Sequence, residues 1–158
     1  MDASKLTTRS QEAVNAAISA AVGAGHSQVE AVHLLAALLA QPEGIIHPLL
    51  HAVGVDPATI SARVEEETRR LPASSGATVG APSYSRAALQ ILAKASDVAA
   101  EMKDDFVSTE HLLIATATVQ SPAGSVLTEA GATADALRGA LGSVRGSGRV
   151  TSQDPEST

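Results

Sequence analysis

The chain has 158 residues, a length typical of one domain with a buried core, and carries a formal net charge of −6. Hydrophobic residues make up 44% of it but aromatic residues only 1%, so Ala, Leu and Val must fill the interior. The acidic balance and the scarcity of aromatic rings argue against nucleic acid as a partner. The absence of cysteine excludes disulfides and thiolate metal sites.

No apolar run approaches the roughly 20 residues that span a bilayer, and the polar stretch 4–11 is unlike the core of a secretory signal. We therefore expect no membrane partner and a cytoplasmic domain. Because apolar residues recur at helical spacing through most of the chain, we also expect the fold to be all-α, with about eight helices.

The first half predicts four helices. The first begins at a capping box formed by Thr8 and Gln11, and the second, 30–40, is apolar almost all round and should lie centrally. The third, from Ile45, stops at Gly54. The fourth begins at Asp56-Pro57, an N-cap followed by Pro in the first turn. Its solvent face pairs two glutamates with arginines four residues later (Glu65 with Arg69, Glu66 with Arg70).

The second half predicts four more helices. The fifth covers about 85–102, and its expected inward positions are Leu89, Leu92, Ala93, Ser96, Val98 and Ala99. Ser108 is the expected N-cap of the sixth. Ser121-Pro122 opens the seventh, which Gly131 closes, and Thr133 caps the eighth.

The two halves repeat one plan. His33 and His111 are 78 positions apart and each begins a His-Leu-Leu, whereas Gly54 and Gly131 are 77 apart, so one deletion separates the halves. We expect two four-helix repeats (6–71 and 84–145) related by a pseudo-two-fold axis, within one domain covering 1–145. Residues 72–83 and 146–158 have the composition of flexible linkers.

Histidines offer the first candidate for chemistry. His47 and His51, four residues apart, share a helix face as zinc ligands often do, but no cysteine or intervening glutamate supports a metal site, and an exposed pair is the preferred interpretation. For His33 and His111 we expect a structural role, in which each ring bonds a backbone carbonyl between helices.

Nothing in the chain indicates catalysis. Serines are frequent, but no Gly-x-Ser-x-Gly elbow is present, and no Gly-Lys pair exists from which a phosphate-binding P-loop could be built. We therefore expect no enzyme activity, no metal and no cofactor for this chain.

The acidic loop that leads into the sixth helix is the remaining candidate. Asp104 and Asp105 directly precede Phe106, the only phenylalanine, and Glu110 follows in the first turn of the helix. Acidic groups near a helix N-terminus can serve only its capping and dipole. An exposed Phe between acids also suits a groove that captures extended peptides. The residues alone leave these two interpretations even.

Several motifs resemble the Clp N-terminal domain family: STEHLL at 108–113, HLLAALL at 33–39, PLLHAVGV at 48–55 and VRGSGRVT at 144–151. The likeness covers essentially the whole chain and is greatest to the ClpB-type disaggregases of actinobacteria. It implies a tandem helical fold and a substrate-binding role without catalysis, in which unfolded or aggregated polypeptides are passed to an ATPase ring. ATP and Mg²⁺ would belong to ATPase modules outside this chain, in a hexameric parent, while the isolated domain would be a monomer.

The resemblance also implies site residues. Thr7, Asp104 and Glu110 match positions of a substrate-handling groove in ClpB-type domains, and Phe106 joins them from the loop argument. In related ClpC domains a Glu precedes the His of both repeats, and the pair reads phosphorylated arginine; here Val32 replaces the first, which argues against that function. The alternative is a free-standing adaptor or decoy that sequesters ligands of Clp unfoldases.

Overall fold

The computed structural model describes residues 3–73, 81–145, 150–151 and 153. The regular secondary structure of the described part is almost all helical, as predicted. Its elements follow one another as η1 (Ala3–Lys5), α1 (Thr8–Gly23), β1 (Gln28–Val29), α2 (Ala31–Leu39), α3 (Ile46–Ala52), α4 (Pro57–Arg69), β2 (Ser83–Tyr84), α5 (Arg86–Glu101), α6 (Thr109–Thr118), α7 (Pro122–Ala130) and α8 (Ala134–Arg145).

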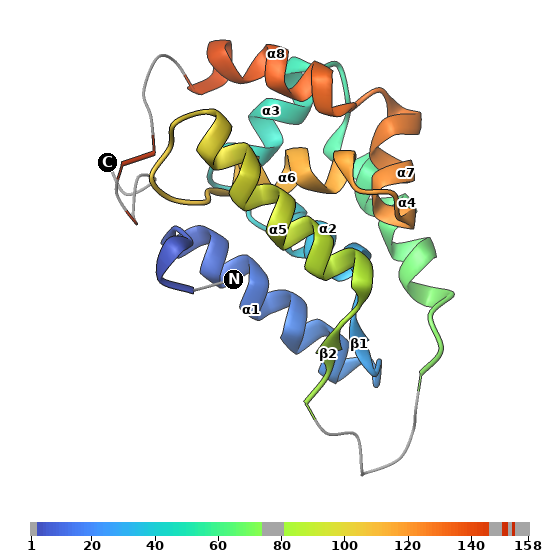
Figure 1. Cartoon of the computed structure of the whole chain (residues 1–158). Coiled ribbons are helices and arrows are strands. Elements are labelled where there is room, and N and C mark those ends of the chain that lie inside the picture. The colour runs from blue at the N-terminus through green and yellow to red at the C-terminus, as the bar shows by residue number, and fades with distance from the viewer. Residues whose placement is uncertain (1–2, 74–80, 146–149, 152, 154–158) are drawn as a thin grey trace.

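The two helices that begin with the His-Leu-Leu motif form the centre of the molecule. Eight of the residues of α2 and nine of those of α6 are buried. Figure 1 shows α1 and α5 on one side of this pair, and α3, α4, α7 and α8 on the other. The core consists mainly of Leu, Ile, Val and Ala side chains, as the composition requires.

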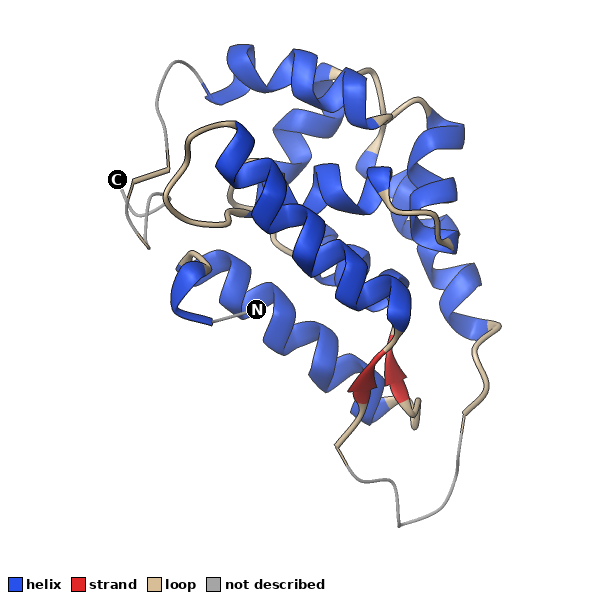
Figure 2. Cartoon of the chain, viewed as in Figure 1, coloured by secondary structure: helices blue, strands red, loops and turns tan. Residues whose placement is uncertain are grey.

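The predicted pseudo-two-fold symmetry appears in how the two halves exchange backbone bonds. The N–H of Thr7 donates to the carbonyl of Val107, and 78 residues further on the N–H of Ser85 donates to that of Val29, each at 3.0 Å. Two short parallel pairings result, Leu6 with Val107 and the β1–β2 pair (Figure 2). The residues before the first helix of each half therefore pair with the other half, and these two pairings join the repeats into one body.

Local signals predicted most helix boundaries. Asp56 and Ser121 accept from the backbone N–H groups of Ala58 and Gly124, each at 3.0 Å, directly before a proline. Thr133 caps α8 at 3.1 Å. Gly54 and Gly131 adopt φ of +79° and +102°, the left-handed conformation expected after a helix.

Two local predictions were wrong. The N-cap of α1 is Thr7, and the Gln11 side chain donates instead to the carbonyls of Ala3 and Leu6, at 3.1 and 3.0 Å. On α4, Glu65 pairs with Arg69 as expected, at 3.2 Å. Arg70, the C-cap residue of α4, pairs with Glu67 at 3.0 Å and not with Glu66, because a spacing of three residues also brings helical side chains together.

Most of the two segments expected to be flexible, 72–83 and 146–158, lies outside the described residues, which leave out 74–80, 146–149, 152 and 154–158. In the parts that are described, Ser83 lies in β2, and Val150 is buried and bonded to residues about 45 positions earlier. The extent of the two linkers stays a prediction. The boundaries of the two repeats stay a prediction.

Candidate functional site

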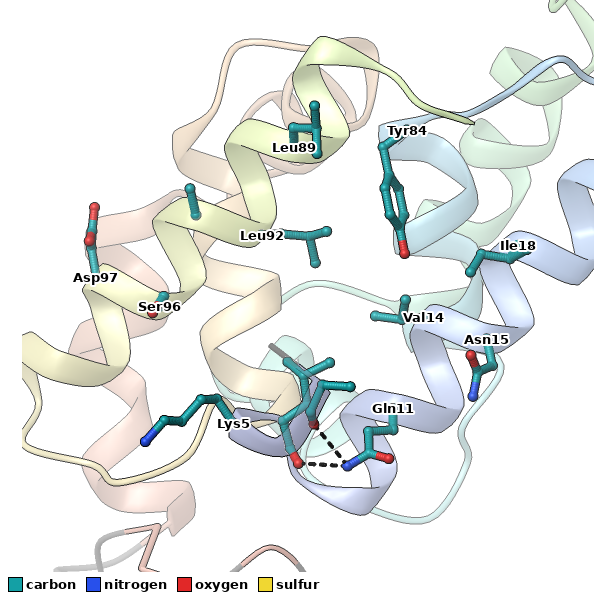
Figure 3. A pocket seen from close by; sticks show the side chains of 13 residues that line it. Lys5, Gln11, Val14, Asn15, Ile18, Tyr84, Leu89, Leu92, Ser96 and Asp97 are labelled. Atoms are coloured by element: carbon teal, nitrogen blue, oxygen red, sulfur yellow. Dashed lines mark hydrogen bonds between the residues drawn. The ribbon is translucent and has the colours of Figure 1, made fainter. Parts of the chain in front are cut away.

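A groove of about 720 Å³ opens between α1 and α5 (Figure 3). Figure 3 shows Leu92 and Tyr84 pointing into the space between the helices, toward Val14. Apolar side chains form most of its floor, and Lys5 and Asp97 supply charges at its rim. The lining residues are Ala3, Lys5, Leu6, Gln11, Val14, Asn15, Ile18, Tyr84, Leu89, Leu92, Ala93, Ser96 and Asp97.

The groove is built on the pseudo-two-fold relation. Its lining contains pairs of positions 78 residues apart, one from each repeat: Leu6 and Tyr84, Gln11 and Leu89, Val14 and Leu92, Asn15 and Ala93, Ile18 and Ser96. The wall from α1 contributes two amide side chains, whereas the matching positions of α5 are Leu and Ala. The part of α5 from Leu89 to Ala93 is therefore more apolar than the matching part of α1, and we call it the apolar wall. At Ile18 and Ser96 the difference is reversed.

Leu89 gives the apolar wall its exposed surface. Leu89 and Val22 are the large hydrophobic side chains exposed among the described residues, at 53% and 54%, and only Leu89 lines the groove. An exposed apolar side chain inside a concave surface is typical of a binding site, whereas a single one on a convex surface is ordinary.

The sequence placed this face of α5 in the core, and that prediction was wrong for three residues. Leu92, Val98 and Ala99 are buried as expected, but Leu89, Ala93 and Ser96 are exposed on the groove. Their spacing marks an apolar helix face correctly. The groove separates that face from α1, and no other described element covers it.

The four residues predicted as the binding site lie elsewhere, and three of them are buried. Thr7, Asp104 and Glu110 are 0%, 8% and 3% exposed, and Phe106 is half-buried. None of the four is among the residues that line the groove. The expectation of an exposed Phe in this loop was therefore wrong. A role for these residues in binding stays a prediction.

The structure brings Asp104 and Glu110 together through Arg145. The guanidinium of Arg145, at the end of α8, bonds Oδ1 of Asp104, and its Nε lies 3.7 Å from Oε2 of Glu110. The other oxygen of Asp104 lies 2.7 Å from Nε2 of His111, and Oδ1 also accepts from the N–H of Val150 at 2.8 Å. A buried carboxylate with this many partners rigidifies its surroundings.

Burial and hydrogen bonding oppose each other at Asp104. Burial alone would raise the pKa of its carboxyl, but the bonds from Arg145, Val150 and His111 outweigh it and hold the pKa below its ordinary value. For His111 burial acts in the other direction, because it disfavours the charged imidazolium, and it lowers the pKa of His111 despite the adjacent carboxylate. Nδ1 of His111 accepts from the N–H of Ser108 at 2.8 Å, so Nε2 carries the proton and donates to Asp104.

The first repeat carries the same arrangement with a different partner. Nδ1 of His33 accepts from the N–H of Glu30 at 2.8 Å, and Nε2 lies 2.8 Å from Nδ1 of His26, the position equivalent to Asp104. Both histidines are therefore structural, as predicted, but they bond the backbone N–H of the N-cap residue and not a carbonyl. Burial and the neighbouring His26 lower the pKa of His33 to about 4.

We expect the pair of His33 and His26 to make the free energy of unfolding smaller as pH is lowered. The pKa of His33 is about 4 in the folded protein and has its ordinary value of 6.5 in the unfolded chain. As pH falls, the unfolded chain therefore binds this proton first. The free energy of unfolding should therefore drop by about 1.5 kcal/mol between pH 6.5 and pH 5. Melting temperatures of the wild type and His33→Asn over that range test this. The variant should lose this part of the slope.

His51→Asn is the matched control, because His51 lies on the surface, away from this pair. It should keep the wild-type dependence on pH. Equal slopes for wild type and His33→Asn would contradict the assignment.

No metal site emerges from the histidines. Nε2 of His47 bonds the carbonyl of Leu39 at 2.8 Å, and His51 is exposed. Within the described ranges, no group of three or more His, Cys, Asp or Glu side chains is placed to hold an ion. Across the same residues, no helix is both long and apolar enough to cross a membrane.

The fold defines a tandem helical-repeat domain with an open groove between α1 and α5, and comparison identifies the family. The Clp repeat (R) N-terminal domain family matches residues 5–130, and the chain belongs to it. It is 46% identical to the chaperone protein ClpB of Mycobacterium tuberculosis strain H37Rv over 158 residues, which is 100% of this chain and 18% of that protein. With ClpB of Corynebacterium glutamicum the identity is 45% over 150 residues, or 95% of this chain and 18% of the relative.

Solved structures agree on the fold. The Hsp104 N-terminal domain from Candida albicans superposes with a TM-score of 0.82 at 24% identity, covering 98% of this chain and 99% of that one. A complex of the ClpV N-domain with VipB peptide gives a TM-score of 0.71 at 19% identity, covering 97% and 91%. The chain spans about a fifth of the length of the curated relatives it matches.

Proposed function

We propose that this chain is the substrate-capturing domain of a cytoplasmic ClpB-type disaggregase, and that the groove between α1 and α5 binds apolar segments of unfolded or aggregated polypeptides. The observation that carries the proposal is a 720 Å³ groove with an exposed leucine on its apolar wall. Identity of 46% to ClpB supports the parent assignment. The ClpV N-domain structure with a peptide supports capture of polypeptide by this fold.

In this proposal the chain binds and does not catalyse. ATP and Mg²⁺ would act in ATPase modules of a hexameric parent, to which the domain would pass its substrate, and the isolated domain would be a monomer. The adaptor or decoy alternative uses the same groove and has no observation of its own in its favour.

The previously predicted site residues take a supporting role in the proposal. Thr7 follows Leu6, which lines the groove, and its backbone pairs with Val107, close to Asp104 and Glu110. By fixing this junction, the three buried residues would hold one end of the groove in shape. We propose the half-buried Phe106 as a contact for segments that extend past this end.

Substitution of Leu89 tests the groove. Leu89→Asp should weaken binding of a labelled, permanently unfolded polypeptide, such as reduced and carboxymethylated α-lactalbumin, at least tenfold. The reason is that it places a charge on the apolar wall, where a bound segment would desolvate it. Fluorescence anisotropy measures the affinity.

Val22→Asp is the matched control. Val22 is as exposed as Leu89 and lies on α1 outside the groove, so the same charge change should leave affinity within about twofold and stability unchanged within about 0.5 kcal/mol. Equal affinities of the two variants would remove the groove as the binding site.

A further inference from the structure

Val150, Thr151 and Gln153, which we call the C-terminal segment, lie at the junction of the two halves, next to the groove. The carbonyl of Val150 accepts from the N–H of Asp105 at 2.7 Å, and its own N–H donates to the carboxylate of Asp104. Beyond it, the carbonyl of Gln153 accepts from the N–H of Thr8 at 2.6 Å, and its side chain donates to the carbonyl of Ser4 at 2.9 Å. The Val150 side chain is buried.

The groups that hold this segment are mostly backbone groups. Thr8, Asp105 and Ser4 offer main-chain donors and an acceptor, and one carboxylate joins them. Main-chain groups recognise an extended polypeptide whatever its sequence, and selectivity then comes from pockets for single side chains. Here the described residues show two such requirements, an apolar residue at the place of Val150 and a side-chain donor at the place of Gln153.

The pseudo-two-fold symmetry shows that the segment is an addition to the frame. The junction beneath it, where Leu6 pairs with Val107, has an equivalent where Tyr84 pairs with Val29. That second junction keeps its backbone bond at 3.0 Å with no described segment laid over it. The geometry of such a junction therefore does not require a covering strand.

Gln153 also lies next to the groove. Ser4, which the Gln153 side chain contacts, lies between Ala3 and Lys5, and both of these line the groove. A polypeptide that replaced the segment would run directly into the proposed substrate path.

We propose that Val150 and Gln153 act as an intramolecular ligand on a second polypeptide site, and that an extended segment with an apolar side chain competes with them for it. The inference extends the proposed function, because the site continues the groove. While the segment is bound, the site is closed to other chains. If it is bound in about 90% of molecules, its release strengthens apparent binding about tenfold.

Val150→Asp should release the segment, since it puts a carboxylate on a side chain that is buried in the wild type. The release also removes the bond from the Val150 N–H to Asp104, which keeps its bonds to Arg145 and His111. Thr151→Asp is the matched control, because Thr151 is exposed in the same segment. The probe is a labelled peptide with the sequence of residues 148–154, added to each full chain. Affinity comes from anisotropy and location from amide NMR shifts.

The peptide should bind the Val150→Asp chain about tenfold more tightly than the wild type or Thr151→Asp, with shifts at Thr8 and Asp105. Equal affinity for the three chains, or no binding to Val150→Asp, overturns the inference. So does a melting temperature of Val150→Asp more than about 10 °C below that of Thr151→Asp, because the segment would then belong to the core.

Two readouts separate this inference from the proposed function. Leu89→Asp, combined with Val150→Asp, should leave peptide binding unchanged, because Leu89 lies on the groove wall and is not among the residues that bond the segment. If the peptide binds Val150→Asp while unfolded α-lactalbumin binds none of the chains, the second site stands and the proposed function fails.

Discussion

Asp104→Ala is expected to lower the free energy of unfolding by about 3–5 kcal/mol. The substitution removes a buried carboxylate that accepts from Arg145, His111 and the N–H of Val150. Arg145 would stay largely buried, at 13% side-chain exposure, with Glu110 at 3.7 Å as its remaining acidic partner in this network. Chemical denaturation at pH 7 measures the loss, which corresponds to a fall of about 6–20 °C in melting temperature.

Asp105→Ala provides the control for this expectation. Asp105 is the exposed neighbour in the same loop, so the change in charge is identical while the network is untouched. Its effect should stay within about 0.5 kcal/mol. A loss below about 1 kcal/mol for Asp104→Ala would show that the network contributes little to stability.

The same comparison decides what Asp104 does in binding. If Asp104 only supports the groove, a variant kept folded at low temperature should bind unfolded polypeptide nearly as well as the wild type. A tenfold loss of affinity in fully folded Asp104→Ala would instead give the carboxylate a direct part in capture.

Helix starts and ends could be read from the sequence because their causes are local. Asp56-Pro57 and Ser121-Pro122 each combine a side-chain acceptor with a residue that lacks an N–H, and both begin helices as predicted. The choice between Thr7 and Thr8 as the first cap was not local. The pairing of Thr7 with Val107, a hundred residues away, holds Thr7 in the extended conformation that a cap requires.

The groove could not be read from periodicity, which identifies apolar faces but not what covers them. On α5 the apolar positions form two faces: Ile91, Ala95 and Val98 are buried, while Leu89 and Ala93 face the groove. The sequence nevertheless contained a signal, because a helix that is covered on one face needs apolar residues only there, whereas α5 carries them on two faces. The burial of Asp104 had no local signal, because Arg145 and Val150 lie more than 40 positions later.

Gly124→Ala is expected to destabilise the protein by about 3 kcal/mol, although the same change inside a helix ordinarily stabilises it. A Cβ at Gly124 would lie 2.6 Å from the carbonyl oxygen of Val119 and 2.8 Å from that of Thr116. Both are backbone atoms at the end of the central helix α6, so they cannot move aside without shifting that helix. Urea denaturation measures the loss.

Gly139→Ala gives the comparison that isolates crowding from helix propensity. Gly139 lies inside α8 on the surface, and a Cβ there meets nothing within 4 Å. That variant should gain about 0.5–1 kcal/mol, because alanine favours the helix. Opposite signs at the two glycines would show that α7 packs on α6 at a distance only glycine permits. Equal signs would mean that the contact relaxes easily, and that the close approach of these helices is not needed to hold α6 in the core.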